Sequence, residues 1–187
     1  MKQFALLAVA ALTLSACQTS PTTGATVTRY PNAGPGAVTS KAVEIAGAAS
    51  LIFVSGNTPQ PADKSAVEFS PQYWGTMEAQ TASALRKIAV TLGEMGLTMA
   101  DVVKVQAFVV APAPGQIADL AGFNQGFGRS FGAASNGKLP SRTVVTVAAL
   151  GRPGMLVEIE VTAVRPAASA AVHVATTAGN RSSARPI

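Results

Sequence analysis

The sequence predicts a single α+β domain, residues 37–165, in which two helices cover one face of a β-sheet. Short apolar runs with a period of two mark the strands, and two longer segments carry apolar residues at helical spacing. Their order along the chain is strand–strand–helix–strand–helix–strand–strand. This order, with no internal repeat, is typical of an α+β domain whose helices pack on one side of the sheet.

The domain opens with two predicted strands, Val38–Ile45 and Leu51–Ser55. The second strand runs directly into a turn with the sequence Ser55-Gly56-Asn57. Gly56 has no side chain, so a ligand could approach the backbone closely at this point. A Ser-Gly turn taken alone is weak support for a binding site, because most such turns are only turns.

Two amphipathic helices are predicted next. Ser70 is a typical N-cap with Pro71 at the first helical position, and Gly96 ends this helix. The second helix follows a Pro/Gly loop, Ala111–Gln116. Each helix has one stripe expected to face the core, formed by Met77, Thr81, Leu85, Ile88, Leu92 and Met95 on the first and by Ile117, Leu120, Phe123, Phe127 and Phe131 on the second.

Three further strands are predicted, and the last two carry the candidate site. They are Val102–Val110, then Arg142–Val147 and Leu156–Val164, and a Gly/Pro turn joins the last two as a hairpin. Arg142 would begin one strand and Glu158 would lie early in its neighbour, so a cation and a carboxylate could frame a small polar pocket. The alternative, from spacing alone, is a hairpin with solvated charges on its outer face.

Composition excludes several kinds of chemistry. The sole histidine is His173 in the small-residue tail, and the sole cysteine is Cys17, so the domain holds neither a Ser-His-Asp or Cys-His triad nor a zinc site of these residues. The formal charge of +5 falls to about +1 for the domain once the terminal cations are set aside: Lys2, Arg165, Arg181 and Arg185. We therefore expect no metal, no cofactor and no nucleic-acid partner.

Residues 1–36 are predicted to direct the protein to a compartment rather than to form part of the domain. Met1–Ala16 has the anatomy of a secretory signal peptide, and its ending Leu14-Ser15-Ala16-Cys17 resembles the bacterial lipobox, in which the cysteine is lipidated. Residues 17–36 would then be a lipidated flexible tether, and Gln18 favours the outer membrane, facing the periplasm. Residues 166–187 are predicted to be disordered. The alternative is an ordinary cleaved signal with an incidental cysteine.

Several segments together resemble the RidA/YjgF family. The C-terminal pair Pro140–Val145 and Val157–Val161 is similar to the signature end of that family. The passage Gln80–Val110 resembles its central helix-to-strand segment, and Phe123-Asn124 matches its Phe-Asn pair. The resemblance covers about Ala37–Arg165, which is most of the chain after the leader.

The resemblance implies a chorismate-mutase-like fold, with two helices on one face of a mixed sheet, and a trimeric, barrel-like assembly with pockets between subunits. It also implies an enamine or imine deaminase that needs no cofactor. Arg142 would grip the carboxylate of a small substrate, and Glu158 would handle the hydrolytic water. Ser55, Gly56 and the backbone of Val144 would line the pocket, and Asn124 would support it, although taken alone Asn124 reads as a surface or capping residue.

The sequence departs from the best-studied deaminases at three places, which keeps a second hypothesis open. Thr39 stands where they carry a tyrosine, Val144 stands where they carry a cysteine, and the turn between Arg142 and Glu158 is one residue longer. The alternative to catalysis is a non-catalytic module in the cell envelope that binds small carboxylates or serves as an interaction platform.

The lipobox predicts that Cys17→Ser blocks lipidation, so that the protein is released or misprocessed. Fractionation of cells under high salt, with the variant beside the wild type, measures this. A Cys17→Ser protein that still sediments with the outer membrane as the wild type does would contradict the lipobox interpretation.

Overall fold

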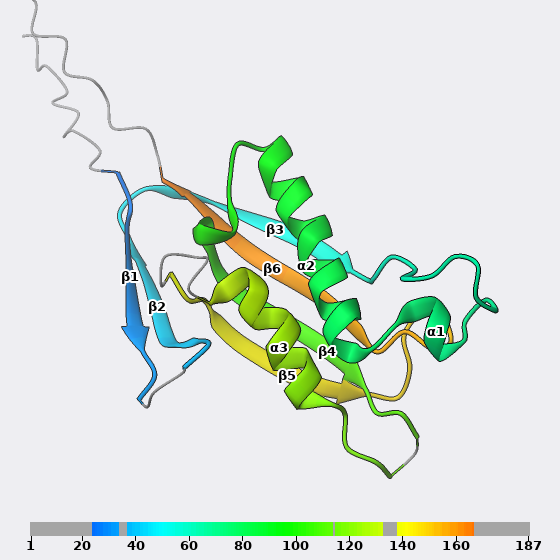
Figure 1. The fold of residues 1–187 in the computed structure, drawn as a ribbon. Coiled ribbons are helices and arrows are strands. Elements are labelled where there is room, and N and C mark those ends of the chain that lie inside the picture. The colour runs from blue at the N-terminus through cyan, green and yellow to red at the C-terminus, as the bar shows by residue number, and fades with distance from the viewer. Residues whose placement is uncertain (1–23, 34–36, 114, 133–137, 167–187) are drawn as a thin grey trace, which may run out of the picture.

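The computed structural model describes residues 24–33, 37–113, 115–132 and 138–166, and its elements are labelled in Figure 1. The strands are β1 (Thr26–Pro31), β2 (Ser40–Ala46), β3 (Ala49–Asn57), β4 (Val102–Val110), β5 (Ser141–Val147) and β6 (Val157–Pro166). The helices are α1 (Pro71–Trp74), α2 (Met77–Glu94) and α3 (Leu120–Phe131), with a 3-10 turn η1 (Met99–Asp101) before β4. The predicted α+β domain is confirmed.

The main sheet is mixed and has the strand order β3-β6-β4-β5. β6 is antiparallel to both β3 and β4, whereas β5 is parallel to β4. The predicted hairpin of the last two strands is therefore wrong, because β4 lies between β5 and β6. The connection 148–156 is long enough to cross β4, whose backbone pairs with β5 along one edge and with β6 along the other.

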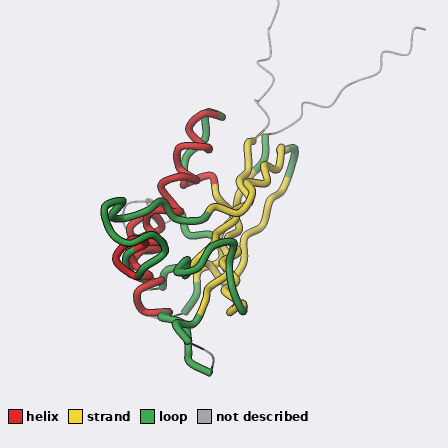
Figure 2. Tube along the Cα trace, turned by 90° about the vertical axis from the view of Figure 1, so that its right-hand side faces the viewer, coloured by secondary structure: helices red, strands yellow, loops and turns green. Residues whose placement is uncertain are grey.

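Helices α2 and α3 cover one face of this sheet, and the strands form a separate layer beside them (Figure 2). The β4 side chains Val103, Val105, Ala107 and Val109 are at most 5% exposed, as the period-two pattern predicts. They pack against the helical stripes, of which Leu85, Ile88, Leu92, Phe123, Phe127 and Phe131 are fully buried. The two predicted stripes thus form most of the core.

The predicted helix that begins at Ser70 is broken into two. Ser70 caps only α1, and Gly75 follows with φ +80°, a left-handed conformation that glycine adopts without strain. Thr76 then caps α2 by accepting a hydrogen bond from the amide of Ala79. The break lets the Trp74 side chain turn inward, where it is 3% exposed.

The second predicted helix begins later than its apolar pattern indicates. Asp119 caps α3 through the amide of Gly122, so Ile117 lies before the helix and is 85% exposed. Leu120 is also exposed, at 44%. The prediction that Ile117 and Leu120 face the core is wrong, because capping by Asp119 decides where the helix starts. The same prediction is right for Phe123, Phe127 and Phe131.

The predicted tether, residues 17–36, contains a strand. β1 pairs antiparallel with β2 in a separate two-stranded sheet. Arg29 fastens it by donating hydrogen bonds to the backbone oxygens of Leu139, Ala100 and Val102 at 2.8, 2.9 and 3.0 Å. Residues 26–31 of the predicted tether therefore form a strand, in which three successive β-branched residues precede the half-buried Arg29.

The predicted leader, the lipidation site Cys17 and the tail 167–187 lie outside the described residues. Among the described residues, no helix has both the length and the apolar character needed to cross a bilayer.

The contact between α2 and α3 depends on a glycine. A Cβ at Gly126 would lie 2.5 Å from the backbone oxygen of Glu78 and 2.7 Å from Cβ of Thr81, so a methyl group would push the helices apart. We expect Gly126→Ala to lower the free energy of unfolding by about 1–3 kcal/mol. Gly128→Ala on the same helix meets nothing within 4 Å and should be neutral or stabilising by up to about 1 kcal/mol.

Urea unfolding of both variants beside the wild type measures this difference. Equal stabilities for Gly126→Ala and Gly128→Ala would contradict the close helix packing.

Candidate functional site

Glu158 lies against the backbone of Gly56 at one end of the main sheet. The pairing of β3 with β6 shifts register between Val54 and Asn57, so Ser55 and Gly56 form a bulge with one extra residue. A Cβ at Gly56 would overlap the Glu158 carboxylate, which therefore occupies the space that any other residue's side chain would need. The Glu158 carboxylate makes no hydrogen bond to the side chains or backbone of the other described residues.

Arg142 lies at the start of β5 beneath helix α3. Its guanidinium carbon is 4.5 Å from the ring centroid of Phe127 and 5.1 Å from that of Phe123, within cation–π distance. Burial lowers the pKa of Arg142 from its ordinary value. Its buried Nη1 has no hydrogen-bond partner among the described residues. A buried charged donor without a partner is costly, so an external acceptor such as a carboxylate would stabilise this arrangement.

Arg142 and Glu158 lie on opposite faces of the sheet. Arg142 pairs with Val105 of β4, whose side chain is buried under the helices, whereas Glu158 pairs with Phe108, which points to the other face. Two strand spacings across the sheet and three residues along it put their Cα atoms about 14 Å apart. One small substrate therefore cannot contact both residues of the same chain.

The remaining predicted site residues divide between these two positions. Ser55 adjoins Gly56 on the bulge, so it accompanies Glu158. Val144 pairs with Ala107 and thus shares the face of Arg142, and Asn124 is an exposed residue next to Phe123 on α3. Thr39 accepts a hydrogen bond from the Asn32 amide at 2.9 Å. The predicted site residues therefore fall into two groups, called half-sites below: Glu158 with Ser55 and Gly56, and Arg142 with Val144. Asn124 lies on the exposed surface of α3, the helix that covers Arg142.

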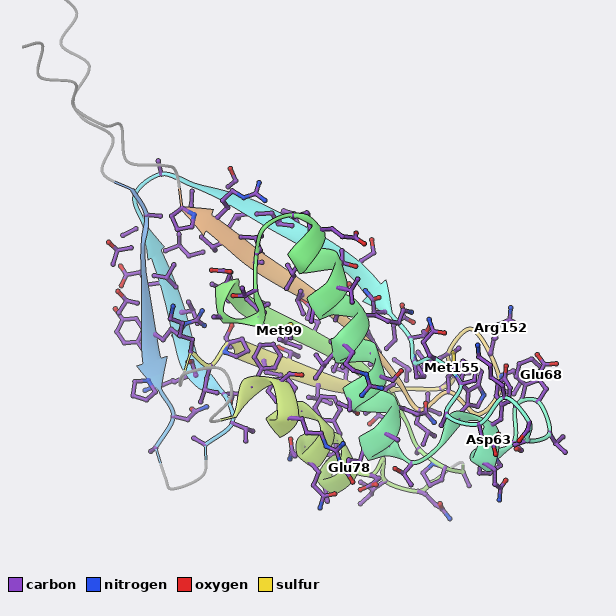
Figure 3. The ribbon with its side chains drawn as sticks, turned by 45° about the horizontal axis from the view of Figure 1, so that its top comes forward. Asp63, Glu68, Glu78, Met99, Arg152 and Met155 are labelled. Carbon is purple, nitrogen blue, oxygen red and sulfur yellow. The ribbon has the colours of Figure 1, made fainter. Side chains whose placement is uncertain are left out.

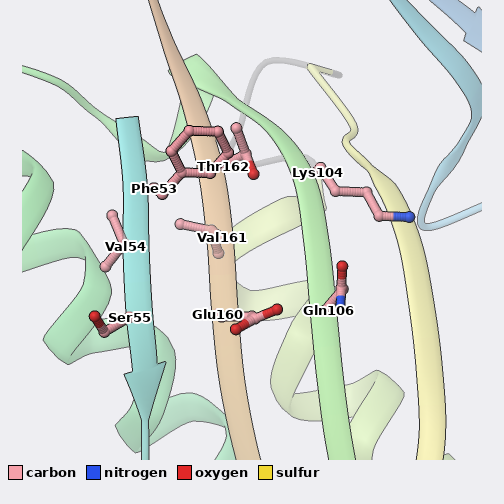
Figure 4. A pocket seen from close by; sticks show the side chains of 8 residues that line it. All are labelled: Phe53, Val54, Ser55, Lys104, Gln106, Glu160, Val161 and Thr162. Atoms are coloured by element: carbon pink, nitrogen blue, oxygen red, sulfur yellow. The ribbon is translucent and has the colours of Figure 1, made fainter. Parts of the chain in front are cut away.

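A hollow of about 330 Å³ lies on the face of the sheet that the helices leave open (Figure 4). Glu160 and Gln106 lie side by side on paired strands there, and the Lys104 ammonium donates to the Thr143 hydroxyl at 2.9 Å. Phe53, at the edge of the hollow, is 76% exposed. The hollow thus combines charged and polar side chains with exposed aromatic surface.

The described residues contain no group of three metal-ligating side chains. The charged groups of the two half-sites are instead the Arg142 guanidinium and the Glu158 carboxylate. Sequence reasoning counted Phe123 and Phe127 only as core residues. It missed their contact with Arg142, because an aromatic residue on a buried helical face gives no sign of which side chain from another element lies under it.

The fold is that of a small α+β protein with two helices on one face of a mixed sheet. Residues 35–165 match the family model described as Endoribonuclease L-PSP. The chain therefore belongs to this family, and solved structures of YjgF and Rid proteins resemble it.

Three solved structures illustrate the likeness. A YjgF-family protein of Mycobacterium tuberculosis is 30% identical over 74% of this chain and 98% of that chain, with a TM-score of 0.46. A Rid-family protein of Yersinia pestis is 27% identical over 74% and 97%, with a TM-score of 0.52. A protein of unknown function from Pseudomonas aeruginosa is 26% identical over 74% and 92%, with a TM-score of 0.51.

Proposed function

We propose that the protein is a cofactor-free deaminase that hydrolyses small enamines or imines bearing a carboxylate. The observation that carries the proposal is the half-buried Arg142 guanidinium beneath Phe123 and Phe127, whose buried Nη1 has no acceptor among the described residues. A planar guanidinium can hold a carboxylate by two parallel hydrogen bonds, which a lysine cannot do. Family membership supports a role of this general kind.

The complete site is proposed to form between two copies of the chain. Because Arg142 and Glu158 face opposite sides of one sheet, Arg142 of one copy would bind the substrate carboxylate while Glu158 of a second copy faces the carbon–nitrogen double bond. The backbone of Gly56, left bare by its missing side chain, would accompany Glu158. Val144 and Asn124 would flank the carboxylate end.

The proposed reaction uses one carboxylate as both base and acid. Glu158 accepts a proton from water as the water oxygen adds to the imine carbon, which gives a carbinolamine. Glu158 then returns that proton to the nitrogen of the carbinolamine. It next takes the proton of the new hydroxyl group and passes it to the nitrogen as the carbon–nitrogen bond breaks, so that the carbon–oxygen double bond forms and ammonia leaves. One imine and one water thus give one 2-oxo acid and one ammonia, with no redox change.

A second candidate is a module that binds small carboxylates without turnover. It rests on the same Arg142 half-site and on Thr39. The deaminases that this sequence resembles carry a tyrosine at the position of Thr39, and threonine has no aromatic ring to line the pocket. The family description names an endoribonuclease, so RNA cleavage is a further activity to assay.

We also propose that the protein is anchored in the cell envelope through Cys17, as the lipobox-like ending of its predicted signal peptide indicates.

Substitution of the two half-sites separates these functions. Arg142→Ala should lose a charge-assisted contact worth about 1.5–3 kcal/mol. This corresponds to about ten- to more than hundredfold weaker binding of a small 2-oxo acid. Arg142→Lys should recover only part of it, and Arg142→Met keeps the apolar stem under the rings as a control for packing. Glu158→Gln should spare binding and abolish turnover, because an amide cannot accept the proton.

Calorimetry with pyruvate measures binding, and ammonia release from freshly generated 2-iminopropanoate measures turnover. Arg86→Ala, an exposed arginine on α2, is the matched control and should change neither quantity. Turnover by the wild type supports the deaminase. Binding without turnover supports the binding module, and cleavage of an RNA substrate by the wild type but not by Glu158→Gln would favour the activity in the family description. Unchanged affinity in Arg142→Ala would overturn the site assignment.

The two-copy site predicts a homotrimer, the assembly that the RidA resemblance implies. The open face of the sheet exposes Phe53 at 76%, Leu51 at 49% and Val145 at 44%, which a neighbouring copy would cover. Light scattering of a chain that begins at Gly24, at micromolar concentration, should give the mass of three copies. A monomer would contradict both the trimer and the shared pocket.

A further inference from the structure

Gln80, a residue of α2, has a buried side-chain amide that connects the segment before α2 to the turn before β6. Its side chain lies near the start of α2 and is 1% exposed. Its Nε2 donates to the backbone oxygens of Gly75 at 3.0 Å and Gly154 at 3.1 Å, and its Oε1 accepts from the amide of Leu156 at 2.8 Å. Both donor hydrogens and the acceptor are therefore used, as a buried amide requires.

A second contact fixes the same turn beside Gln80. Trp74 Nε1 donates to the backbone oxygen of Pro153 at 2.8 Å. Gly154 has φ +81°, and a Cβ there would lie 2.5 Å from Trp74 Cδ1 and 2.6 Å from the oxygen of Phe69. The turn that carries Arg152 lies at the same end of the molecule as the loop that carries Glu68 (Figure 3). The turn before β6 is thus held against the segment before α2.

The backbone at the start of β6 connects the turn held by Gln80 and Trp74 to the Glu158 half-site. Leu156 is held at both ends, since its amide donates to Gln80 and its oxygen accepts from the amide of Val110 at 2.9 Å. Glu158 lies two residues further along the chain. Its side chain points to the opposite face of the sheet from those of Val157 and Ile159, because successive residues of a strand alternate between faces. Its carboxylate then meets Gly56.

We propose that Gln80 is a positioning residue for Glu158: it sets where β6 begins and so holds the carboxylate over Gly56. The proposal rests on the proposed function only for its effect on turnover. Gln80 touches neither the carboxylate nor Gly56, and it acts through the Leu156 amide and the Gly154 oxygen. A displacement of about 1 Å at a reacting group can lower a rate about a hundredfold.

The alternative is that Gln80 only stabilises the fold, and three variants distinguish the two roles. Gln80→Leu removes all three hydrogen bonds at similar volume, and Gln80→Glu keeps an acceptor for Leu156 but loses both donors. Thr81→Val is the matched control, because Thr81 is the next residue, is fully buried, and has an Oγ1 without a partner among the described residues. Gly126→Ala controls for lost stability at a distance from Glu158.

The first measurement does not depend on activity. Two-dimensional NMR of the Gly56 amide should show a shift in Gln80→Leu in the same direction as in Glu158→Gln, and no shift in Thr81→Val or Gly126→Ala. Gln80→Glu should show a smaller shift, because the Leu156 amide keeps its acceptor. A Gly56 signal unchanged in Gln80→Leu, or moved equally in Gly126→Ala, would overturn the proposal.

The second measurement is turnover of freshly generated 2-iminopropanoate. Gln80→Leu should lower kcat by about ten- to a hundredfold and leave KM within about twofold, because Arg142 still binds the carboxylate. Gly126→Ala should keep kcat per folded molecule. A Gln80→Leu variant in which KM rises as strongly as kcat falls would overturn the positioning role. Absence of turnover in the wild type would contradict the proposed function, and the NMR measurement would then decide the role of Gln80 by itself.

Discussion

The position of β4 between β5 and β6 is the constraint on which the rest of the structure depends. β4 pairs with both neighbours and buries its alternating valines under the helices, which makes it the centre of the core. Its register then decides the face of every side chain on the flanking strands, because paired residues point the same way. Arg142 consequently lies with Val105 beneath α3, and Glu158 lies with Phe108 on the open face.

This division explains why a single chain holds two incomplete half-sites. The Arg142 guanidinium is stabilised by the rings of Phe123 and Phe127, yet its buried Nη1 lacks an acceptor among the described residues. The Glu158 carboxylate occupies the space over Gly56 without a hydrogen-bond partner among the described residues. The open face of the sheet, on which Glu158 lies, also exposes Phe53, Leu51 and Val145.

Close approaches of the backbone hold the carboxylate half-site in place. The bulge at Ser55 and Gly56 supplies room for Glu158, and the left-handed Gly154 lets the turn before β6 pack against Trp74. The buried amide of Gln80 then joins this turn to α2.

The sequence by itself determined most of the elements and the choice of candidate residues. Period-two and helical spacings located the strands, the stripes of α2 and α3 and the choice of Arg142 and Glu158 as candidates, because local periodicity and residue type are properties of neighbours along the chain. Tertiary structure alone decided the break at Gly75, the late start of α3 and the ordering of β1 by Arg29, since each depends on caps or contacts with distant segments. It also decided that β4 separates the last two strands. Strand order is set by which faces the core can bury together, and no local pattern around Arg142 or Glu158 records that choice.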